Sequence, residues 1–168
     1  MAAAKAAPDP AKRIIQLLTE TGKTIVTAES CTGGMIAAAL TDIPGASASF
    51  IGGYVTYSNL AKSRMIHVQP RLIRDYGAVS NQVARAMADG ARNTARADFA
   101  VAVTGIAGPD GGSEKKPVGL VYVAVSSELA TVVIEHQFGD LGRLPVREAS
   151  VKAALDLVVQ VLTSTTEG

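Results

Sequence analysis

The apolar run Phe99–Val103, with the sequence FAVAV, is the feature that most constrains the fold of this chain. Its residues show no alternation of polar and apolar side chains, which is typical of a strand buried on both faces. Such a strand needs helices on both sides of its sheet. The run therefore predicts an α/β fold in which a central sheet lies between two helical layers.

The remaining segments supply the other elements of such a sandwich. Short β-branched runs predict strands at Thr24–Ala28 and Phe50–Tyr57, and two closely spaced runs, Leu120–Ser126 and Thr131–Phe138, predict a hairpin. Because of this hairpin, the predicted fold class is a three-layer α/β/α sandwich with a mixed, mostly parallel five-stranded sheet. Helical patterns and end signals predict helices at Ala11–Thr21, Gly33–Leu40, Ser58 or Asn59 to Ile66, Pro70–Gly77, Ser80–Ala97 and Val146–Leu162.

Length and composition indicate one small domain with no role at membranes or on nucleic acid. We expect residues 1–10 to be a disordered lead-in and residues 11–168 to form a single domain. No apolar run reaches the roughly 18 residues of a membrane span. The net charge of +1 and the low aromatic content argue against nucleic-acid binding. The single cysteine excludes an internal disulfide and fits a reducing compartment, so we expect a cytoplasmic protein.

Ser30 is the first candidate for chemistry, because it follows a strand and precedes two glycines. In open α/β sheets, ligands bind beyond the carboxyl ends of the strands. The segments Glu29–Gly34, Tyr57–Lys62 and Thr104–Gly112 should therefore meet at one edge. Ser30 or Thr32 would either cap the next helix or present a hydroxyl to a cleft lined by helix N–H groups. The spacing alone favours the cap.

A serine nucleophile needs a base, and Lys62 is the best candidate. Both histidines, His67 and His136, lie where structural or exposed roles are more common. If Asn59 is the N-cap, Lys62 lies in the first turn of a helix, where the helix dipole should lower its pKa. Tyr57 could then relay or orient the proton. The alternative, an ordinary surface lysine, stays open.

Cys31 is a rival nucleophile, although no histidine stands near it in the sequence. The loop Gly105–Gly112 would let backbone N–H groups approach a phosphate, and a purely structural loop is the alternative. Arg143 and Arg147 lie four residues apart and could hold a phosphate together, or could be solvated. Metal-ligand spacing is absent from the sequence, so we predict that no metal is needed.

Four motifs in this order, AESCTGG, GGYVTYSNLAK, GAVS and VTGIAGPDGGSEKKPVG, resemble those of the CinA C-terminal domain family. This family includes the stand-alone nicotinamide mononucleotide amidohydrolases called PncC. The resemblance extends from about Ala11 to Leu162. It implies a three-layer α/β/α fold and hydrolysis of the carboxamide of nicotinamide mononucleotide by a serine–lysine mechanism, with no cofactor and no metal.

The resemblance also implies roles for individual residues. Ser30, Tyr57 and Lys62 fall on the motif positions tied to catalysis, and Ser47 is a second candidate nucleophile that the sequence does not exclude. Ser30 is favoured over Ser47. Glu29 is expected to balance the positive charge of the pyridinium ring. The residues expected to contact substrate are Glu29, Thr32, Gly33, Thr104, Gly105, Ala107, Gly108 and Arg143.

The expected partner is therefore a small molecule, and the resemblance suggests a homo-oligomer such as a dimer. Two other functions remain open. One is a module that binds a pyridine nucleotide without turning it over, which intact Ser30, Tyr57 and Lys62 argue against. The other is a protein associated with competence or DNA damage, which is suggested by the family name alone.

Overall fold

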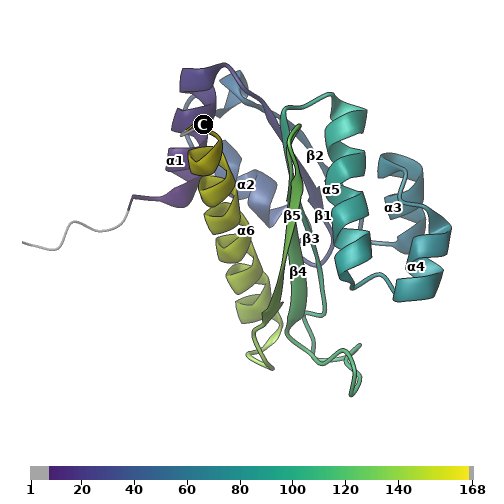
Figure 1. Cartoon of the computed structure of the whole chain (residues 1–168). Helices are drawn as coiled ribbons and strands as arrows, with labels where there is room; N and C mark the ends of the chain where they lie inside the picture. Colours follow the sequence, from purple (N-terminus) through teal and green to yellow (C-terminus); the bar gives the residue numbers. More distant parts are fainter. Residues whose placement is uncertain (1–7, 167–168) are drawn as a thin grey trace, which may run out of the picture.

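The computed structural model describes residues 8–166 and shows a five-stranded sheet between two layers of helices (Figure 1). The strand order is β2-β1-β3-β4-β5. β1 pairs in parallel with β2 and β3, whereas β4 pairs antiparallel with β3 and β5, so every strand except β4 runs in the same direction. The predicted sandwich with a mixed, mostly parallel sheet is confirmed. The strands are β1 (Ile25–Glu29), β2 (Phe50–Val55), β3 (Phe99–Gly105), β4 (Leu120–Ser126) and β5 (Thr131–Gln137).

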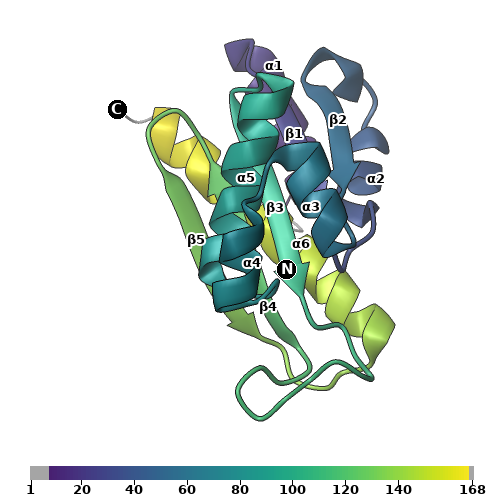
Figure 2. The same ribbon diagram turned by 90° about the vertical axis from the view of Figure 1, so that its right-hand side faces the viewer.

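The helices divide between the two faces of this sheet (Figures 1 and 2). One layer contains α1 (Pro10–Thr21), α2 (Met35–Thr41) and α6 (Arg143–Thr166). The other contains α3 (Asn59–Ile66), α4 (Pro70–Tyr76) and α5 (Asn81–Ala95), of which α5 lies directly on the sheet. A short 3₁₀ helix, η1 (Ala46–Ala48), precedes β2.

β3 is the centre of both cores. Val101 and Val103 pack among the residues of α1, α2 and α6, whereas Ala100 and Ala102 pack against α5 on the opposite face. All four side chains are fully buried. This confirms the interpretation of the FAVAV run, and the small alanines let α5 lie close to the sheet.

The ends of two helices differ from the prediction. Asp9 caps α1 by accepting a hydrogen bond from the Ala11 N–H, and Pro10 is the first helical residue. The predicted disordered lead-in therefore extends too far, while its first part, residues 1–7, lies outside the described residues. At the other end α6 begins at Arg143 rather than Val146. Pro145 fits there because the first N–H groups of a helix have no acceptor within the helix.

The sheet brings three loops to one edge. Glu29, the last residue of β1, pairs with Val55 on one side and Val103 on the other. The segments that follow β1, β2 and β3 therefore leave the sheet side by side. Within residues 8–166, no helix has both the length and the apolar character needed to cross a bilayer.

Candidate active site

A cavity of about 260 Å³ lies beyond the carboxyl ends of β1, β2 and β3. Residues from all three predicted segments line it, together with Arg143 from α6. Ala78 and Val79, from the loop between α4 and α5, also line it. These two belong to the GAVS motif, and nothing in their side chains would have indicated a place at the site.

The lysine and serine of the expected pair are in contact inside this cavity. The Lys62 Nζ lies 3.1 Å from the Ser30 Oγ. It also donates to the carbonyl oxygen of Thr56 at 2.9 Å and to that of Tyr57 at 3.4 Å. Only 1% of Lys62 and 8% of Ser30 is exposed. Among the described residues no carboxylate is hydrogen-bonded to this ammonium position, and burial lowers the pKa of Lys62, while Cys31 raises it slightly.

The lowered pKa arises from burial rather than from the expected helix-end position. The Ser58 hydroxyl caps α3 by accepting from the Ala61 N–H, so Lys62 begins the second turn of the helix instead of lying in the first. The helix can pack closely against α5 because Gly90 of α5 has no side chain. A Cβ there would overlap the carbonyl oxygen of Ile66 at the end of α3.

Glu29 has a different role from the one predicted. Its carboxylate is 1% exposed and does not line the cavity. It accepts hydrogen bonds from the Thr32 hydroxyl and the Ile36 N–H, both at 2.8 Å, and from the Ala37 N–H at 3.0 Å. Glu29 thus satisfies the first N–H groups of α2, a function that the sequence interpretation gave to Ser30 or Thr32. Both oxygens of Glu29 are bonded within the protein and neither faces the cavity, so the geometry gives its expected contact with the substrate no support.

Thr32 and Gly33, also expected at the substrate, lie in the turn behind the cavity rather than in its lining. Arg147 holds this turn. Its Nε donates to the Cys31 carbonyl at 3.0 Å and its Nη2 donates to the Thr32 carbonyl at 3.2 Å. Arg147 therefore does not join Arg143 as a second phosphate ligand. Its two bonds fix the peptide groups on either side of Thr32, in the turn that follows Ser30.

Arg143 and Tyr57 meet at the cavity. The Arg143 Nη1 donates to the Gly108 carbonyl at 2.8 Å, and its Nη2 donates to the Tyr57 phenol at 2.9 Å. The Tyr57 side chain is 60% exposed and its hydroxyl contacts neither Ser30 nor Lys62. The predicted proton relay through the phenol is therefore not formed. The part of Tyr57 that contacts Lys62 is its backbone carbonyl.

The rival nucleophiles are placed unfavourably. Burial raises the pKa of the Cys31 thiol from 9.0 to about 11, so the thiolate is scarce near neutral pH. Ser47 lies in η1, before β2, whereas Ser30 follows the end of the parallel strand β1. The length of a strand, roughly 15 Å at about 3.3 Å per residue, separates the two serines. Ser47 does not line this cavity, so within one chain the structure gives its candidate role as nucleophile no support.

The glycine-rich loop forms another wall of the cavity. Gly105, Ala107 and Gly108 line it, and the Thr104 hydroxyl lines it while donating to the Ala78 carbonyl at 2.9 Å. Ala107 and Gly108 are buried, yet within residues 8–166 their backbone N–H groups donate to no acceptor. Buried donors without acceptors next to Arg143 are suited to an anionic ligand.

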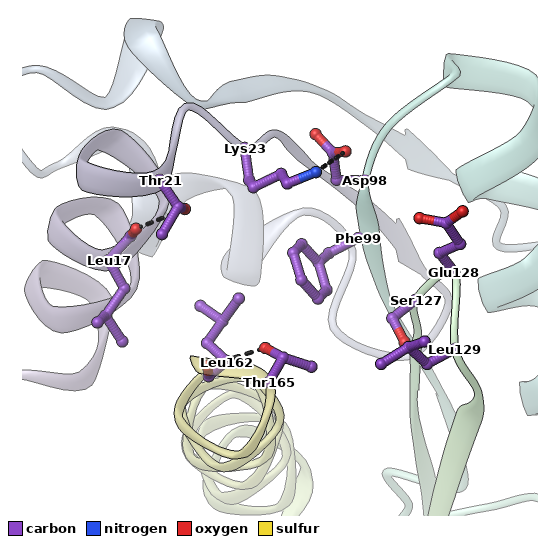
Figure 3. Close-up of a pocket in the computed structure, with 10 residues that line it drawn as sticks. All are labelled: Leu17, Thr21, Lys23, Asp98, Phe99, Ser127, Glu128, Leu129, Leu162 and Thr165. Atoms are coloured by element: carbon purple, nitrogen blue, oxygen red, sulfur yellow. Dashed lines mark hydrogen bonds and ion pairs between the residues drawn. The ribbon is translucent and has the colours of Figure 1, made fainter. Parts of the chain in front are cut away.

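A second cavity, of about 270 Å³, lies at the opposite edge of the sheet (Figure 3). Phe99 and Leu162 form its apolar floor. Its lysine, Lys23, is paired with Asp98 at 3.2 Å, and its serine, Ser127, donates to the Ala130 carbonyl. The lysine and the serine each have a partner other than the other, so this cavity offers no serine activated by a free amine. In the described part of the chain, no three His, Cys, Asp or Glu side chains are grouped as a metal site would require.

Comparisons with known proteins agree with this architecture. The family model described as CinA C-terminal domain matches residues 8–162. A CinA-like protein of Acidobacterium capsulatum is 52% identical over 146 residues, which are 86% of this chain and 35% of the relative. A CinA-like protein of Geobacter sp. is 56% identical over 133 residues, 79% of this chain and 32% of the relative. The chain thus spans about a third of the length of these curated relatives.

Two solved structures match almost completely. The competence/damage inducible protein CihA from Agrobacterium tumefaciens matches with a TM-score of 0.89 and 47% sequence identity. The match covers 96% of this chain and 99% of the CihA chain. A competence-damaged protein (CinA) superfamily protein from Escherichia coli matches with a TM-score of 0.86 and 31% sequence identity. The match covers 96% of this chain and 95% of the Escherichia coli chain. With a family model that spans nearly all of its residues and these neighbours in sequence and structure, the chain belongs to the CinA C-terminal domain family.

Proposed function

We propose that this protein is an amidohydrolase that converts nicotinamide mononucleotide to nicotinic acid mononucleotide and ammonia. The observation that carries the proposal is the contact between the Lys62 Nζ and the Ser30 Oγ, two side chains that are both buried at the wall of the cavity. A hydroxyl is a weak nucleophile until a base removes its proton. A lysine whose pKa is lowered by burial is such a base.

The other bonds of Lys62 favour this role. A neutral amine has two N–H bonds and one lone pair. The carbonyls of Thr56 and Tyr57 accept the two hydrogens, which leaves the lone pair for the Ser30 O–H. After proton transfer the ammonium has three acceptors, the third being the serine oxygen. Lys62 is therefore held in one orientation in both protonation states, and the attack needs little reorganisation.

The transition state needs a donor for the carboxamide oxygen as it gains negative charge. The backbone N–H of Cys31, next to Ser30, donates to no oxygen acceptor in residues 8–166. Arg147 fixes the carbonyls of Cys31 and Thr32 and so orients the peptide planes of this turn. Losing one such donor typically costs about 2.7–4 kcal/mol of barrier. In this proposal the alkoxide attacks, the Lys62 ammonium returns its proton to the amide nitrogen so that ammonia leaves, and water then hydrolyses the Ser30 ester to release the acid.

The phosphate of the nucleotide would bind at the glycine-rich loop and Arg143. The free N–H groups of Ala107 and Gly108 and the guanidinium of Arg143 support this assignment. The cationic pyridinium ring would disfavour a second positive charge at Lys62, which keeps the lysine neutral. Equal turnover of the nucleotide and of free nicotinamide would contradict the phosphate assignment.

The test is ammonia release from nicotinamide mononucleotide with EDTA present. Lys62→Met should lower kcat by roughly 10²–10⁴-fold, the usual contribution of a positioned base, and Ser30→Ala, which removes the nucleophile, should lower it at least as much. Ser47→Ala is the matched serine control and should keep wild-type activity. A fully active Lys62→Met enzyme would refute the serine–lysine mechanism. If the wild type binds the nucleotide but releases no ammonia, the protein is the non-catalytic binding module instead.

A further inference from the structure

The segment between α4 and α5, Gly77–Ser80, has no role in the mechanism above, although two of its residues line the cavity. Ala78 and Val79 lie there beside Ser30 and Lys62. The segment has no regular secondary structure. Something other than a helix or sheet ladder must therefore hold this part of the cavity wall in place.

Side chains supply that support. Four consecutive backbone carbonyls, those of residues 76–79, each accept a hydrogen bond from a side chain. The donors are the Lys116 Nζ to the carbonyls of Tyr76 at 2.6 Å and Val79 at 2.7 Å, the Ser80 Oγ to that of Gly77 at 2.8 Å, and the Thr104 Oγ1 to that of Ala78 at 2.9 Å. Lys116 thus provides two of the four bonds, those to the first and the last of the four carbonyls.

Lys116 comes from the connection between β3 and β4, Ile106–Gly119, which contains most of the glycine-rich stretch and is called the glycine-rich loop from here on; it projects beyond the sheet below α4 in Figure 2. The base of this loop is closed by backbone bonds between Ile106 and Gly119 and between Ile106 and Leu120. Its tip is a turn in which the Ser113 N–H donates to the Lys116 carbonyl. Lys116 therefore projects from an ordered turn rather than from a loose chain.

Side-chain hydrogen bonds from only two residues tie this loop to other elements of the described chain. Arg143 of α6 binds the Gly108 carbonyl at one side. Lys116 binds the carbonyls of Tyr76 and Val79 at the other. Both the loop and the Ala78–Val79 segment line the cavity, so the bonds of Lys116 set the distance between two of its walls.

Gly77 leaves room for this ammonium. A Cβ at Gly77 would lie 2.7 Å from the Lys116 Nζ, and the backbone there has a φ of +81°, which L side chains rarely adopt. The position of the Lys116 ammonium therefore requires a glycine at the end of α4, 39 residues earlier in the chain. The ammonium also lies at the carboxyl end of α4, where backbone carbonyls lack helical partners and a cation is favoured.

We propose that Lys116 is a positioning residue for the substrate, because its two hydrogen bonds hold the Ala78–Val79 wall and the glycine-rich loop at the spacing that the nucleotide requires. The inference rests on the proposed function for the identity of the ligand. Lys116 does not line the cavity and takes no part in the chemistry. Its loss should weaken binding of the nucleotide and leave the Ser30–Lys62 contact intact.

The experiment compares Lys116→Met and Lys116→Arg with the wild type. Lys115→Met is the matched control, because Lys115 is exposed and makes no side-chain hydrogen bond in the described residues. Lys116→Met should raise KM and the Kd for nicotinamide mononucleotide about tenfold, as expected for losing a hydrogen bond to a charged group. The kcat should change little. Lys116→Arg, which keeps a cation with several donors, should recover part of the affinity, and Lys115→Met should match the wild type.

Amide hydrogen exchange provides a reading that does not depend on turnover. In Lys116→Met, exchange should accelerate at the hydrogen-bonded amides of Gly77, Ser113 and Gly119, and stay unchanged at the Cys31–Gly34 turn. Unchanged exchange at both walls, or a KM and Kd equal to those of Lys115→Met, would overturn the inference. A lower thermal midpoint with unaltered KM and Kd would also overturn it, since Lys116 would then only stabilise the fold. Absence of ammonia release by the wild type would instead contradict the proposed function.

Discussion

Replacing Glu29 by glutamine tests whether this residue supports the nucleophile turn or meets the substrate. The substitution keeps the shape of the side chain and exchanges one carboxylate oxygen for an NH₂ group. The carboxylate accepts from three donors: Thr32 and Ile36 at one oxygen, and Ala37 at the other. An amide has only one acceptor oxygen, so at least one of these donors must face another donor.

The magnitude follows from these bonds. A hydrogen bond to a charged group contributes about 1.5–3 kcal/mol, and a buried donor left without an acceptor costs about 1–3 kcal/mol. Because these two effects overlap, we expect Glu29→Gln to lower the free energy of unfolding by about 2–4 kcal/mol. For a protein of this size each kcal/mol shifts the thermal midpoint by about 2–4 °C, so the midpoint should fall by roughly 4–16 °C.

Circular dichroism melts and steady-state kinetics together decide the question. Glu148→Gln is the matched control: Glu148 is exposed on α6, and its midpoint should stay within about 2 °C of the wild type. Glu29→Gln should also lower kcat, because Ser30 adjoins the loosened turn. An unchanged midpoint with a raised KM would refute this reasoning. That result would restore Glu29 as the counter-charge of the pyridinium ring.

Three further predictions concern single side chains. Because burial lowers the pKa of Lys62, the unfolded chain holds this proton more tightly, so the destabilisation due to Lys62 is largest at low pH and disappears as pH approaches 10.5. Lys62→Met should therefore raise the thermal midpoint more at pH 7 than at pH 10, and equal shifts would contradict this. Since the pKa of Cys31 is about 11, iodoacetamide at pH 8 should alkylate it far more slowly than free cysteine, and Cys31→Ser should keep activity. Tyr57→Phe removes the bond to Arg143, so it should raise KM for the nucleotide and leave kcat unchanged; a large fall in kcat would restore the phenol as a proton relay.

The sheet could be predicted because its signals are local. The run from Phe99 to Val103 carries side chains for two cores, and that pattern appears in five consecutive residues. The signals for the helix ends are also local in the sequence: Gly22 ends α1 in a left-handed conformation, and Ser80 caps the first turn of α5. The pairing of β1 with both β2 and β3 then follows from the general arrangement of alternating strands and helices.

The site was harder to predict because its decisive features are contacts between distant residues. Nothing near Lys62 in the sequence shows that its side chain is buried. Burial depends on Gly90, which lets α3 approach α5. The role of Arg147 likewise depends on where α6 passes behind the Ser30 turn, more than a hundred residues away in the chain. The family motifs marked Ser30 and Lys62 but could not distinguish a capping residue from a cavity residue.

The two buried ionisable groups of the site, Glu29 and Lys62, are not paired with one another, and this makes the lysine usable as a base. Each is 1% exposed, and a direct ion pair between them would hold Lys62 as an ammonium. Instead, the Glu29 carboxylate accepts hydrogen bonds from two N–H groups of α2 and from the Thr32 hydroxyl. The Lys62 amine is hydrogen-bonded to two carbonyl groups and to the Ser30 hydroxyl. Lys62 is thereby desolvated without a counter-ion, and that environment favours a neutral amine able to accept the serine proton.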